Sequence, residues 1–239
     1  MIRAKKSLSQ NFLIDKNISK KIIKQVNIYK RVVMEIGPGY GFMTDHILEG
    51  NPKKLILIEK DNNLVKHLKK KFKDNHKIEI IEKDIINFNL SDYKNLIIIS
   101  NLPYNISTKI ILHLFHFNKN ISEMILMLQK EVAEKFNYKL PKMNKYKFLT
   151  KMFSNYKICF NVSPNVFFPK PKVESSIVKF KLINKNINIS KIKTFSNLIF
   201  KNVRKKIANN ISIKKSSNLL DKRVDQLTIK ELLNIYYFF

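Results

Sequence analysis

Glu35-Ile36-Gly37-Pro38-Gly39-Tyr40-Gly41 is a glycine-rich stretch in which a strand predicted to be buried, over 31–36, runs into a loop and then into a predicted helix over 42–48. Glycine lacks a Cβ and reaches positive φ, so a strand–loop–helix of this kind lets the backbone approach a nucleotide-like ligand closely. The third glycine comes one residue early for the dinucleotide pattern G-x-G-x-x-G, and the Gly-Lys-Ser/Thr ending of a phosphate loop is missing. A plain tight turn is the alternative at this point.

Apolar strands and helical patterns alternate along the chain after this loop. Further strands are predicted over 55–59, 78–81, 95–100 and 123–128, and helices over 62–72 and 108–117. This alternation predicts an α/β fold, a Rossmann-like parallel sheet with helices on both faces. Two late strands, over 156–162 and 175–182, flank a proline-rich segment and are predicted to form an antiparallel hairpin that closes the sheet.

The charge of the chain points to a polyanionic partner. The 239 residues include 46 Lys and Arg against 18 Asp and Glu, which gives a formal net charge of +28. Codon bias towards A and T accounts for part of the lysine excess, but it does not explain why so few acids offset it. Nucleic acid is the favoured partner. An anionic membrane surface is the weaker alternative, because the sequence has no clear amphipathic anchor.

Several classes of protein are excluded by what the sequence lacks. A hydrophobic content of 44% excludes a disordered basic tail. The single cysteine, Cys159, excludes an intramolecular disulfide and a cysteine-based zinc cluster. The 5 histidines show no ligand spacing, so we expect no metal. No apolar run reaches the roughly 18 residues of a membrane helix, and no signal-peptide core stands at the N-terminus.

Two acidic residues stand at the ends of predicted strands. Glu59 ends the second strand, where a carboxylate accepts hydrogen bonds from both hydroxyls of a ribose. Asp84 follows the third strand, at a place where it would meet an adenine edge. For either acid alone, a solvated loop position is an equal alternative. Because open α/β sheets bind ligands at the carboxyl ends of their strands, the acids and the loop together favour an adenosine-containing ligand. Without a phosphate signature, S-adenosylmethionine fits better than NAD.

Asn101-Leu102-Pro103-Tyr104 stands at the end of the next predicted strand. The tetrapeptide resembles the [Asn/Asp]-Pro-Pro-Tyr motif of methyltransferases that act on the N6 amine of adenine. That amine is a poor nucleophile because its lone pair is delocalised into the ring. We expect the Asn101 side chain and the Leu102 carbonyl to accept from both N–H groups, Pro103 to fix the turn, and Tyr104 to stack on the base. A chance loop before a helix is the alternative.

The chain as a whole resembles the KsgA-type ribosomal RNA adenine N6-dimethyltransferases, which are related to the Erm methyltransferases and to mitochondrial transcription factor B. The resemblance runs nearly end to end. It rests on Ser9 to Leu13 (SQNFL), Glu35 to Gly41, Asn101 to Thr108 (NLPYNIST), Gln129 to Ala133 (QKEVA), Phe167 to Ser175 (FFPKPKVES), Val203 to Lys206 with Asn209 and Asn210, and Asp221 to Leu233. Between 134 and 156 the chain departs from the family's Tyr-Gly-Arg-Leu-like stretch.

The resemblance implies individual site residues. The contacts to S-adenosylmethionine fall on Asn11, Leu13, Gly37, Glu59, Asp84 and Asn101. The aromatic pair around the target base falls on Tyr104 and Phe167, which complete a catalytic set with Asn101, Leu102 and Pro103. From the residues alone, Asn11 is interpreted as a surface residue, and Leu13 and Phe167 as core residues.

The pattern of the last third of the chain indicates a second domain. A polar, weakly patterned segment over 184–190 predicts a linker, and helical patterns over 191–205 and 228–237 follow it. We therefore expect a methyltransferase catalytic domain over 1–184 and a small, basic, all-helical domain over 185–239 that binds rRNA.

The function that the resemblance implies is dimethylation of two adjacent adenines in a hairpin near the 3′ end of small-subunit (16S) rRNA, as a step in ribosome biogenesis. The expected partner is that rRNA or the assembled 30S subunit. An Erm-type large-subunit enzyme is one alternative, and a catalytically idle RNA-binding assembly or transcription factor is another. Leu102 and the basic C-terminal segment favour the first reading. Because the family motif begins by Ser9, we expect no organelle presequence and therefore a bacterial cytoplasm. We also expect a monomer.

Overall fold

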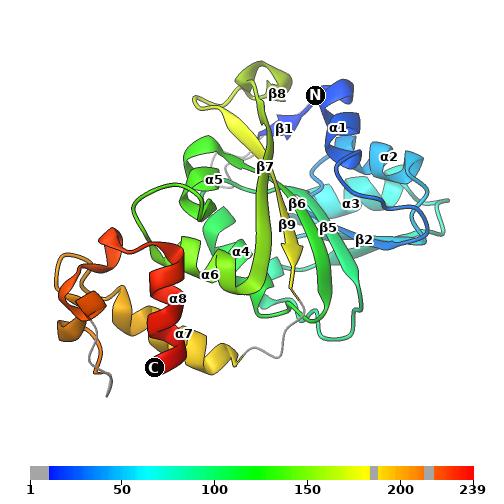
Figure 1. Cartoon of the computed structure of the whole chain (residues 1–239). Coiled ribbons are helices and arrows are strands. Elements are labelled where there is room, and N and C mark those ends of the chain that lie inside the picture. The colour runs from blue at the N-terminus through cyan, green and yellow to red at the C-terminus, as the bar shows by residue number, and fades with distance from the viewer. Residues whose placement is uncertain (1–10, 184–187, 213–217) are drawn as a thin grey trace. The chain divides into compact units, whose positions relative to one another are not determined.

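A seven-stranded sheet with the order β4-β3-β2-β5-β6-β9-β7 organises the fold (Figure 1). The computed structural model describes residues 11–183, 188–212 and 218–239. The strands of this sheet are β2 (Val32–Ile36), β3 (Lys54–Glu59), β4 (Ile78–Glu82), β5 (Leu96–Asn101), β6 (Ile121–Gln129), β7 (Ser154–Val162) and β9 (Ser175–Leu182). Strands β2 to β6 pair in parallel, and β9 pairs antiparallel with β6. The mostly parallel α/β fold predicted from the sequence is confirmed.

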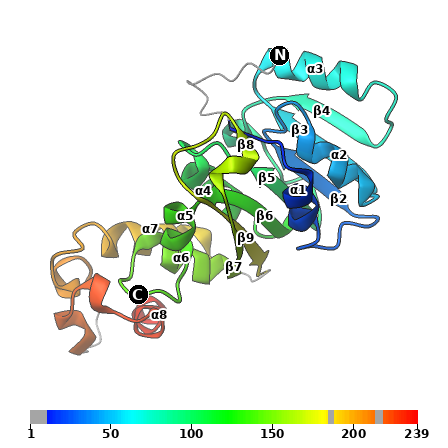
Figure 2. The ribbon, with the colours of Figure 1, turned by 90° about the horizontal axis from the view of Figure 1, so that it is seen from above.

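Helices cover both faces of this sheet (Figure 2). They are α1 (Lys16–Ile23), α2 (Phe42–Glu49), α3 (Asn62–Lys71) and α4 (Ser107–Phe115), and a further helix, α5 (Lys130–Phe136), follows β6 directly. Helices α2 and α3 connect β2 to β3 and β3 to β4, whereas α4 connects β5 to β6 in the opposite direction along the sheet. Since crossovers of this kind are right-handed, α2 and α3 lie on one face and α4 on the other. Helix α1 packs beside α2.

The central strands are apolar along most of their length because both faces are covered. Val33, Leu55, Leu57, Ile97 and Ile99 are each no more than 1% exposed and belong to one core cluster. Strands that are buried on both sides have no solvent face on which to alternate polar residues. This is why the sequence shows continuous apolar runs at these places.

A second, two-stranded sheet joins the N-terminal segment to the late proline-rich segment. Its strands are β1 (Phe12–Leu13) and β8 (Phe167–Phe168), which pair antiparallel with Phe12 opposite Phe168 and Leu13 opposite Phe167. Successive side chains of a strand point to opposite faces. Leu13 and Phe167 therefore share one face, and both belong to the core cluster with 4% and 3% exposure. The sequence analysis did not predict this sheet.

The chain divides into two compact units. The first comprises Met1–Ala133 and Lys157–Leu182, and the second comprises Glu134–Tyr156 and Ile183–Phe239. The second unit thus contains α6 (Lys145–Phe153) from the middle of the chain, together with α7 (Ile189–Ile199) and α8 (Ile229–Phe238). The sequence predicts one domain over all of 1–184, and this division stays a prediction. Residue 184 itself lies outside the described residues, as do Ser9 and Gln10 of the family motif.

Aromatic packing explains why α6 belongs to the second unit. The Phe148 ring of α6 lies 5.3 Å from the Phe195 ring of α7 and 5.8 Å from the Tyr236 ring of α8, measured between centroids. Phe148 and Phe195 are fully buried. Helical periodicity at each site gives no sign that these helices, which are distant in sequence, form one core.

The helix predicted over 191–205 is wrong beyond Ile199, where α7 ends. The Asn210 side-chain amide donates to the carbonyls of Ile199 and Asn202, at 3.2 and 3.1 Å, and so satisfies groups at the helix end. Lys201 would stand four residues from Lys205 in a continued helix, and like charges at that spacing are destabilising. Charge and capping together favour the turns that the structure has here.

Candidate active site

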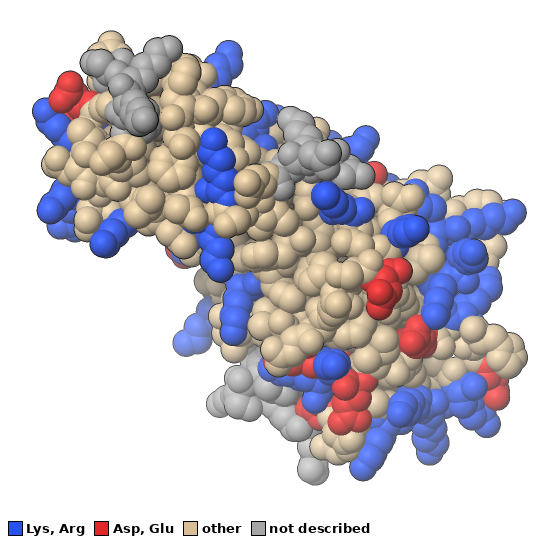
Figure 3. Space-filling view, turned by 90° about the horizontal axis from the view of Figure 1, so that it is seen from below, with Lys and Arg blue, Asp and Glu red and all other residues tan. Residues whose placement is uncertain are grey.

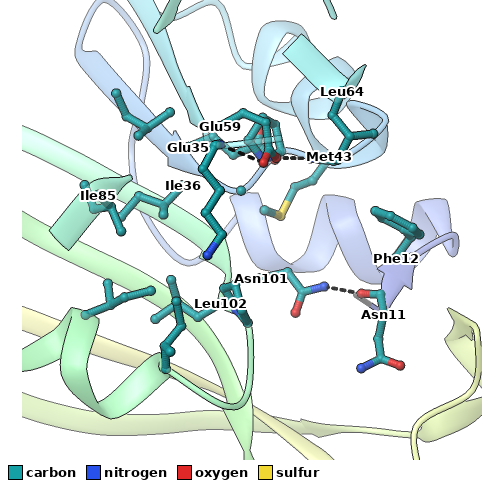
Figure 4. Close-up of a pocket in the computed structure, with 18 of the residues that line it drawn as sticks. Asn11, Phe12, Glu35, Ile36, Met43, Glu59, Leu64, Ile85, Asn101 and Leu102 are labelled. Carbon is teal, nitrogen blue, oxygen red and sulfur yellow. Dashed lines mark hydrogen bonds between the residues drawn. The ribbon is translucent and has the colours of Figure 1, made fainter. Parts of the chain in front are cut away.

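One pocket opens at the carboxyl ends of the central parallel strands (Figure 4). The strand order runs outward in two directions from β2, whose neighbours are β3 and β5. Open α/β sheets bind ligands at such a point. The site residues predicted from the sequence that line the pocket are Asn11, Leu13, Gly37, Glu59, Asp84, Asn101, Leu102, Pro103 and Tyr104. The structure thus brings together residues that are far apart in the sequence: Asn11 and Tyr104, the first and last of this set, are separated by 93 positions.

The glycine loop forms one wall of this pocket. Gly37 and Gly39 have φ of 64° and 59°, in the left-handed region that favours glycine. A Cβ on Gly37 would meet no atom within 4 Å, so the backbone there borders open space that a ligand can fill. A Cβ on Gly39 would lie 2.6 Å from the Phe12 ring. Glycine at 39 therefore lets β1 lie closely over the loop.

Glu59 links the end of β3 to the glycine loop. The residue is 6% exposed, and its Oε1 accepts from the backbone amides of Lys60 and Asp61 at 2.9 and 3.0 Å. Its Oε2 accepts from the Gly39 amide at 3.4 Å. Burial raises the pKa of this carboxyl, and the amide donors oppose that shift. An ionised carboxylate has about two lone-pair sites on each oxygen, so Oε1 is filled by its two amides. A ribose would bind at Oε2, whose single contact, to the Gly39 amide, is long.

Glu35 is a pocket residue to which the sequence analysis assigned no role. It is 1% exposed, lines the pocket and accepts from Thr44 Oγ1 at 2.6 Å. Burial raises the pKa of the Glu35 carboxyl to about 8, so the carboxyl is mostly protonated at neutral pH. A cation bound in the pocket would favour its ionised form. The strand pattern alone could not identify it, because its burial depends on how α2 packs on β2.

Asp84 stands at the pocket with one oxygen already in use. Its Oδ1 accepts from the Ile86 amide at 3.0 Å, which caps the short helix Ile85–Asn87. Its Oδ2 lies 3.9 Å from Lys60 Nζ. The adenine contact predicted for Asp84 stays a prediction, and the geometry leaves Oδ2 for it.

Asn101 is held in one orientation by the N-terminal segment. Its side-chain Nδ2 donates to the backbone carbonyl of Asn11 at 2.8 Å, as the dashed line in Figure 4 shows. A carbonyl oxygen only accepts, so the amide nitrogen must face Asn11. The side-chain oxygen of Asn101 is consequently left as an acceptor. The resemblance implies a place at the site for both residues, but nothing in the sequence shows that one orients the other.

Leu102 to Tyr104 form the turn that follows β5. Leu102 is 1% exposed, and the Pro103 carbonyl accepts from the Ile106 amide at 3.2 Å as the chain turns towards α4. The Tyr104 hydroxyl and Ser175 Oγ lie 2.5 Å apart. Burial raises the pKa of the Tyr104 hydroxyl, and the contact with Ser175 opposes the shift. Ser175 is fully buried at the start of β9 and was not predicted as a site residue.

Phe167 is the predicted site residue that does not line the pocket. It is 3% exposed and packs in the core cluster with Leu13, opposite which it lies in the β1–β8 sheet. This burial agrees with the interpretation from the residues alone, a core aromatic. The role in base stacking that the resemblance implies for Phe167 stays a prediction.

The fold and the pocket at the ends of its parallel strands are those of an α/β methyltransferase. The model of the ribosomal RNA adenine dimethylase family matches residues 1–237, and the chain belongs to that family. It is 39% identical to the ribosomal RNA small subunit methyltransferase A of Mycoplasmopsis synoviae (strain 53), over 85% of this chain and 80% of the relative. It is 36% identical to the protein of the same name from Sulfurihydrogenibium sp. (strain YO3AOP1), over 98% of this chain and 96% of the relative.

Two solved structures share the fold across nearly the whole chain. A dimethyladenosine transferase from Plasmodium falciparum superposes with a TM-score of 0.78 at 22% identity, over 95% of this chain and 100% of that one. The 23S rRNA methyltransferase ErmE superposes with a TM-score of 0.78 at 18% identity, over 95% of this chain and 98% of that one. At these identities the likeness concerns the fold alone, so it does not distinguish small-subunit from large-subunit substrates.

Proposed function

We propose that the chain transfers methyl groups from S-adenosylmethionine to the N6 amine of adenines in small-subunit rRNA. Two relatives at 36% and 39% identity that carry a small-subunit name support this substrate over a large-subunit one. The observation that carries the chemistry is the fixed amide of Asn101, whose nitrogen is held by the Asn11 carbonyl. The finer target, two adjacent adenines in a hairpin near the 3′ end, belongs to the same proposal.

The base end of the pocket acts by positioning the amine. The Asn101 side-chain oxygen and the Leu102 carbonyl accept from its two N–H groups, which directs the nitrogen lone pair away from the ring plane. Pro103 fixes the turn that holds both acceptors, and Tyr104 stacks on the base. A target adenine must leave its stack to reach these groups. The rate enhancement then comes from orientation and fixed dipoles.

The other end of the pocket binds the methyl donor. When bound, S-adenosylmethionine supplies a methyl group on a positively charged sulfur, and its demethylated form, S-adenosylhomocysteine, is the product. Glu59 accepts from the ribose hydroxyls, Asp84 meets the adenine edge, and Gly37 lets the donor lie against the backbone. Asn11 and Leu13, just before and within β1, line the pocket from the N-terminal segment. The donor set fits this ligand, because the pocket combines the buried carboxylate of Glu59 with the open space beside Gly37.

The surface charge supports an RNA partner. Figure 3 shows Lys and Arg side chains spread over one face of the molecule, with acidic side chains confined to a few places. The second unit carries the exposed basic residues Lys201, Arg204 and Lys205, which we assign to rRNA binding. Within the described residues no helix could cross a membrane. A monomeric state, a cytoplasmic location and independence from metals stay predictions.

A labelling experiment tests the function. The protein is incubated with methyl-labelled S-adenosylmethionine and with small or large ribosomal subunits that lack adenine dimethylation. We expect label in small-subunit rRNA, recovered as N6,N6-dimethyladenosine. Label in the large subunit would instead favour the Erm-type activity, and binding to subunits without any transfer would favour an idle assembly factor.

Replacing Glu59 is expected to weaken binding of the methyl donor. Glu59→Ala removes charge-assisted hydrogen bonds worth roughly 1.5–3 kcal/mol, and calorimetric titration with S-adenosylmethionine measures the loss. Glu82→Ala is the matched control, since Glu82 ends the neighbouring strand β4 and is exposed. A dissociation constant that is unchanged in folded Glu59→Ala would remove this carboxylate from the donor site.

A further inference from the structure

Phe168 is an exposed aromatic side chain beside the pocket. It is 50% exposed and lies directly opposite Phe12 in the β1–β8 sheet. Side chains of directly opposed residues stand on the same face of a sheet, with Cβ atoms about 4.5–5.5 Å apart. Phe12 lines the pocket, and its ring packs against Tyr40 of the glycine loop at 5.0 Å between centroids. Phe168 therefore stands at the rim of the pocket, on the face opposite to that of Phe167.

The residues around Phe168 are basic and apolar. Lys170, Lys172 and Val173 follow it on the same loop and are all exposed, Val173 at 44%. Lys130 forms an ion pair with Glu174 at 2.8 Å. By contrast, neither Lys170 nor Lys172 has a carboxylate within ion-pair distance in the part of the chain that the structure describes. The loop thus presents an open ring and two cations at the edge of the active site.

We propose that Phe168 stacks on the nucleotide next to the target adenine, while Lys170 and Lys172 contact the phosphates on either side of it. The proposal rests on the proposed function, because it places an RNA strand at this pocket. A flipped base leaves its neighbour without a stacking partner. An aromatic face replaces that stacking for any base, and lysines along the same path attract the backbone. The loop has both features, and it adjoins the site through β1.

Binding of protein-free small-subunit rRNA tests the proposal without requiring methyl transfer. Phe168→Ala is expected to weaken binding by about 5- to 150-fold, which corresponds to the roughly 1–3 kcal/mol of one base–aromatic stack. Phe168→Tyr should bind rRNA as tightly as the wild type, and Phe168→Leu should bind with an affinity between those of the wild type and Phe168→Ala. The affinity for S-adenosylmethionine and the melting temperature should stay at wild-type values in all three variants.

The salt dependence separates the ring from the lysines. Lys170→Gln and Lys172→Gln should each lower the slope of log affinity against log salt by about 0.7, the value for one phosphate contact on a single strand. Phe168→Ala should leave that slope unchanged. Tyr29→Ala is the matched control: Tyr29 is 54% exposed beside Lys30, but it precedes β2 and so lies at the opposite end of the strands. Its rRNA affinity should equal that of the wild type.

Two results would overturn the proposal. The first is wild-type rRNA affinity in Phe168→Ala. The second is weakening that occurs only with assembled subunits and not with protein-free rRNA, since a ribosomal protein would then cover Phe168. If the wild-type chain binds rRNA but labels neither subunit, the proposed methyl transfer fails, while the comparison of Phe168 variants still decides the stacking.

Discussion

Phe167→Ala is expected to lower the free energy of unfolding by about 3–5 kcal/mol, the usual effect of deleting a buried phenyl ring. Phe167 is 3% exposed in a cluster that includes Leu13, Val162 and Ile177. Removing the ring leaves a cavity that neighbouring strands cannot close without moving. Urea denaturation measures the change from the transition midpoint at constant slope.

The adjacent phenylalanine supplies a matched control for this result. Phe168→Ala removes the same side chain from a position that is 50% exposed, so its free energy of unfolding should change by no more than about 0.5 kcal/mol. Methylation per folded molecule in Phe167→Ala then tests the role that the resemblance implies. Normal turnover would confine Phe167 to the core. A loss of turnover beyond the unfolded fraction would give the ring a catalytic role as well. Wild-type stability would contradict its placement in the core.

The parts of the site that the sequence predicts are those fixed by a single segment. Glu59 and Asn101 are the last residues of their strands, and Gly37 and Asp84 come just after theirs. Parallel strands bring these carboxyl ends to one edge of the sheet. Local pattern therefore determines both the strand and the place of the residue at its end. The positions of Asn11 and Leu13 came from family resemblance, because no local pattern places an N-terminal segment over the glycine loop.

The parts that sequence reasoning missed depend on contacts between distant segments. The β1–β8 sheet consists of two residues on each strand, which is too short for an alternating pattern to identify. It decides that Phe167 faces the core and Phe168 the exposed face, since a shift of one residue exchanges the faces of a strand. A sequence with two adjacent phenylalanines gives no sign of which ring is buried.

Tyr104→Ala is expected to reduce methylation by about 100-fold or more, because the target base loses its stacking face and is no longer held where its amine meets Asn101 and Leu102. Affinity for S-adenosylmethionine and melting temperature should change little, since Tyr104 is only partly buried and stands beyond Asn101 in the turn. Single-turnover assays on small subunits separate this loss from slow product release. A normal single-turnover rate in folded Tyr104→Ala would contradict the role of Tyr104 in stacking on the base.

The contact between Tyr104 and Ser175 allows the ring and its orientation to be tested separately. Tyr104→Phe keeps the stacking face but loses the hydroxyl that lies 2.5 Å from Ser175 Oγ, so its rate should fall much less than that of Tyr104→Ala. Ser175→Ala should produce a loss of similar size. If the two groups act only through each other, the double variant should be no slower than either single variant. Additive losses would instead mean that the Tyr104 hydroxyl contacts the substrate directly, and that Ser175 affects the rate independently of Tyr104.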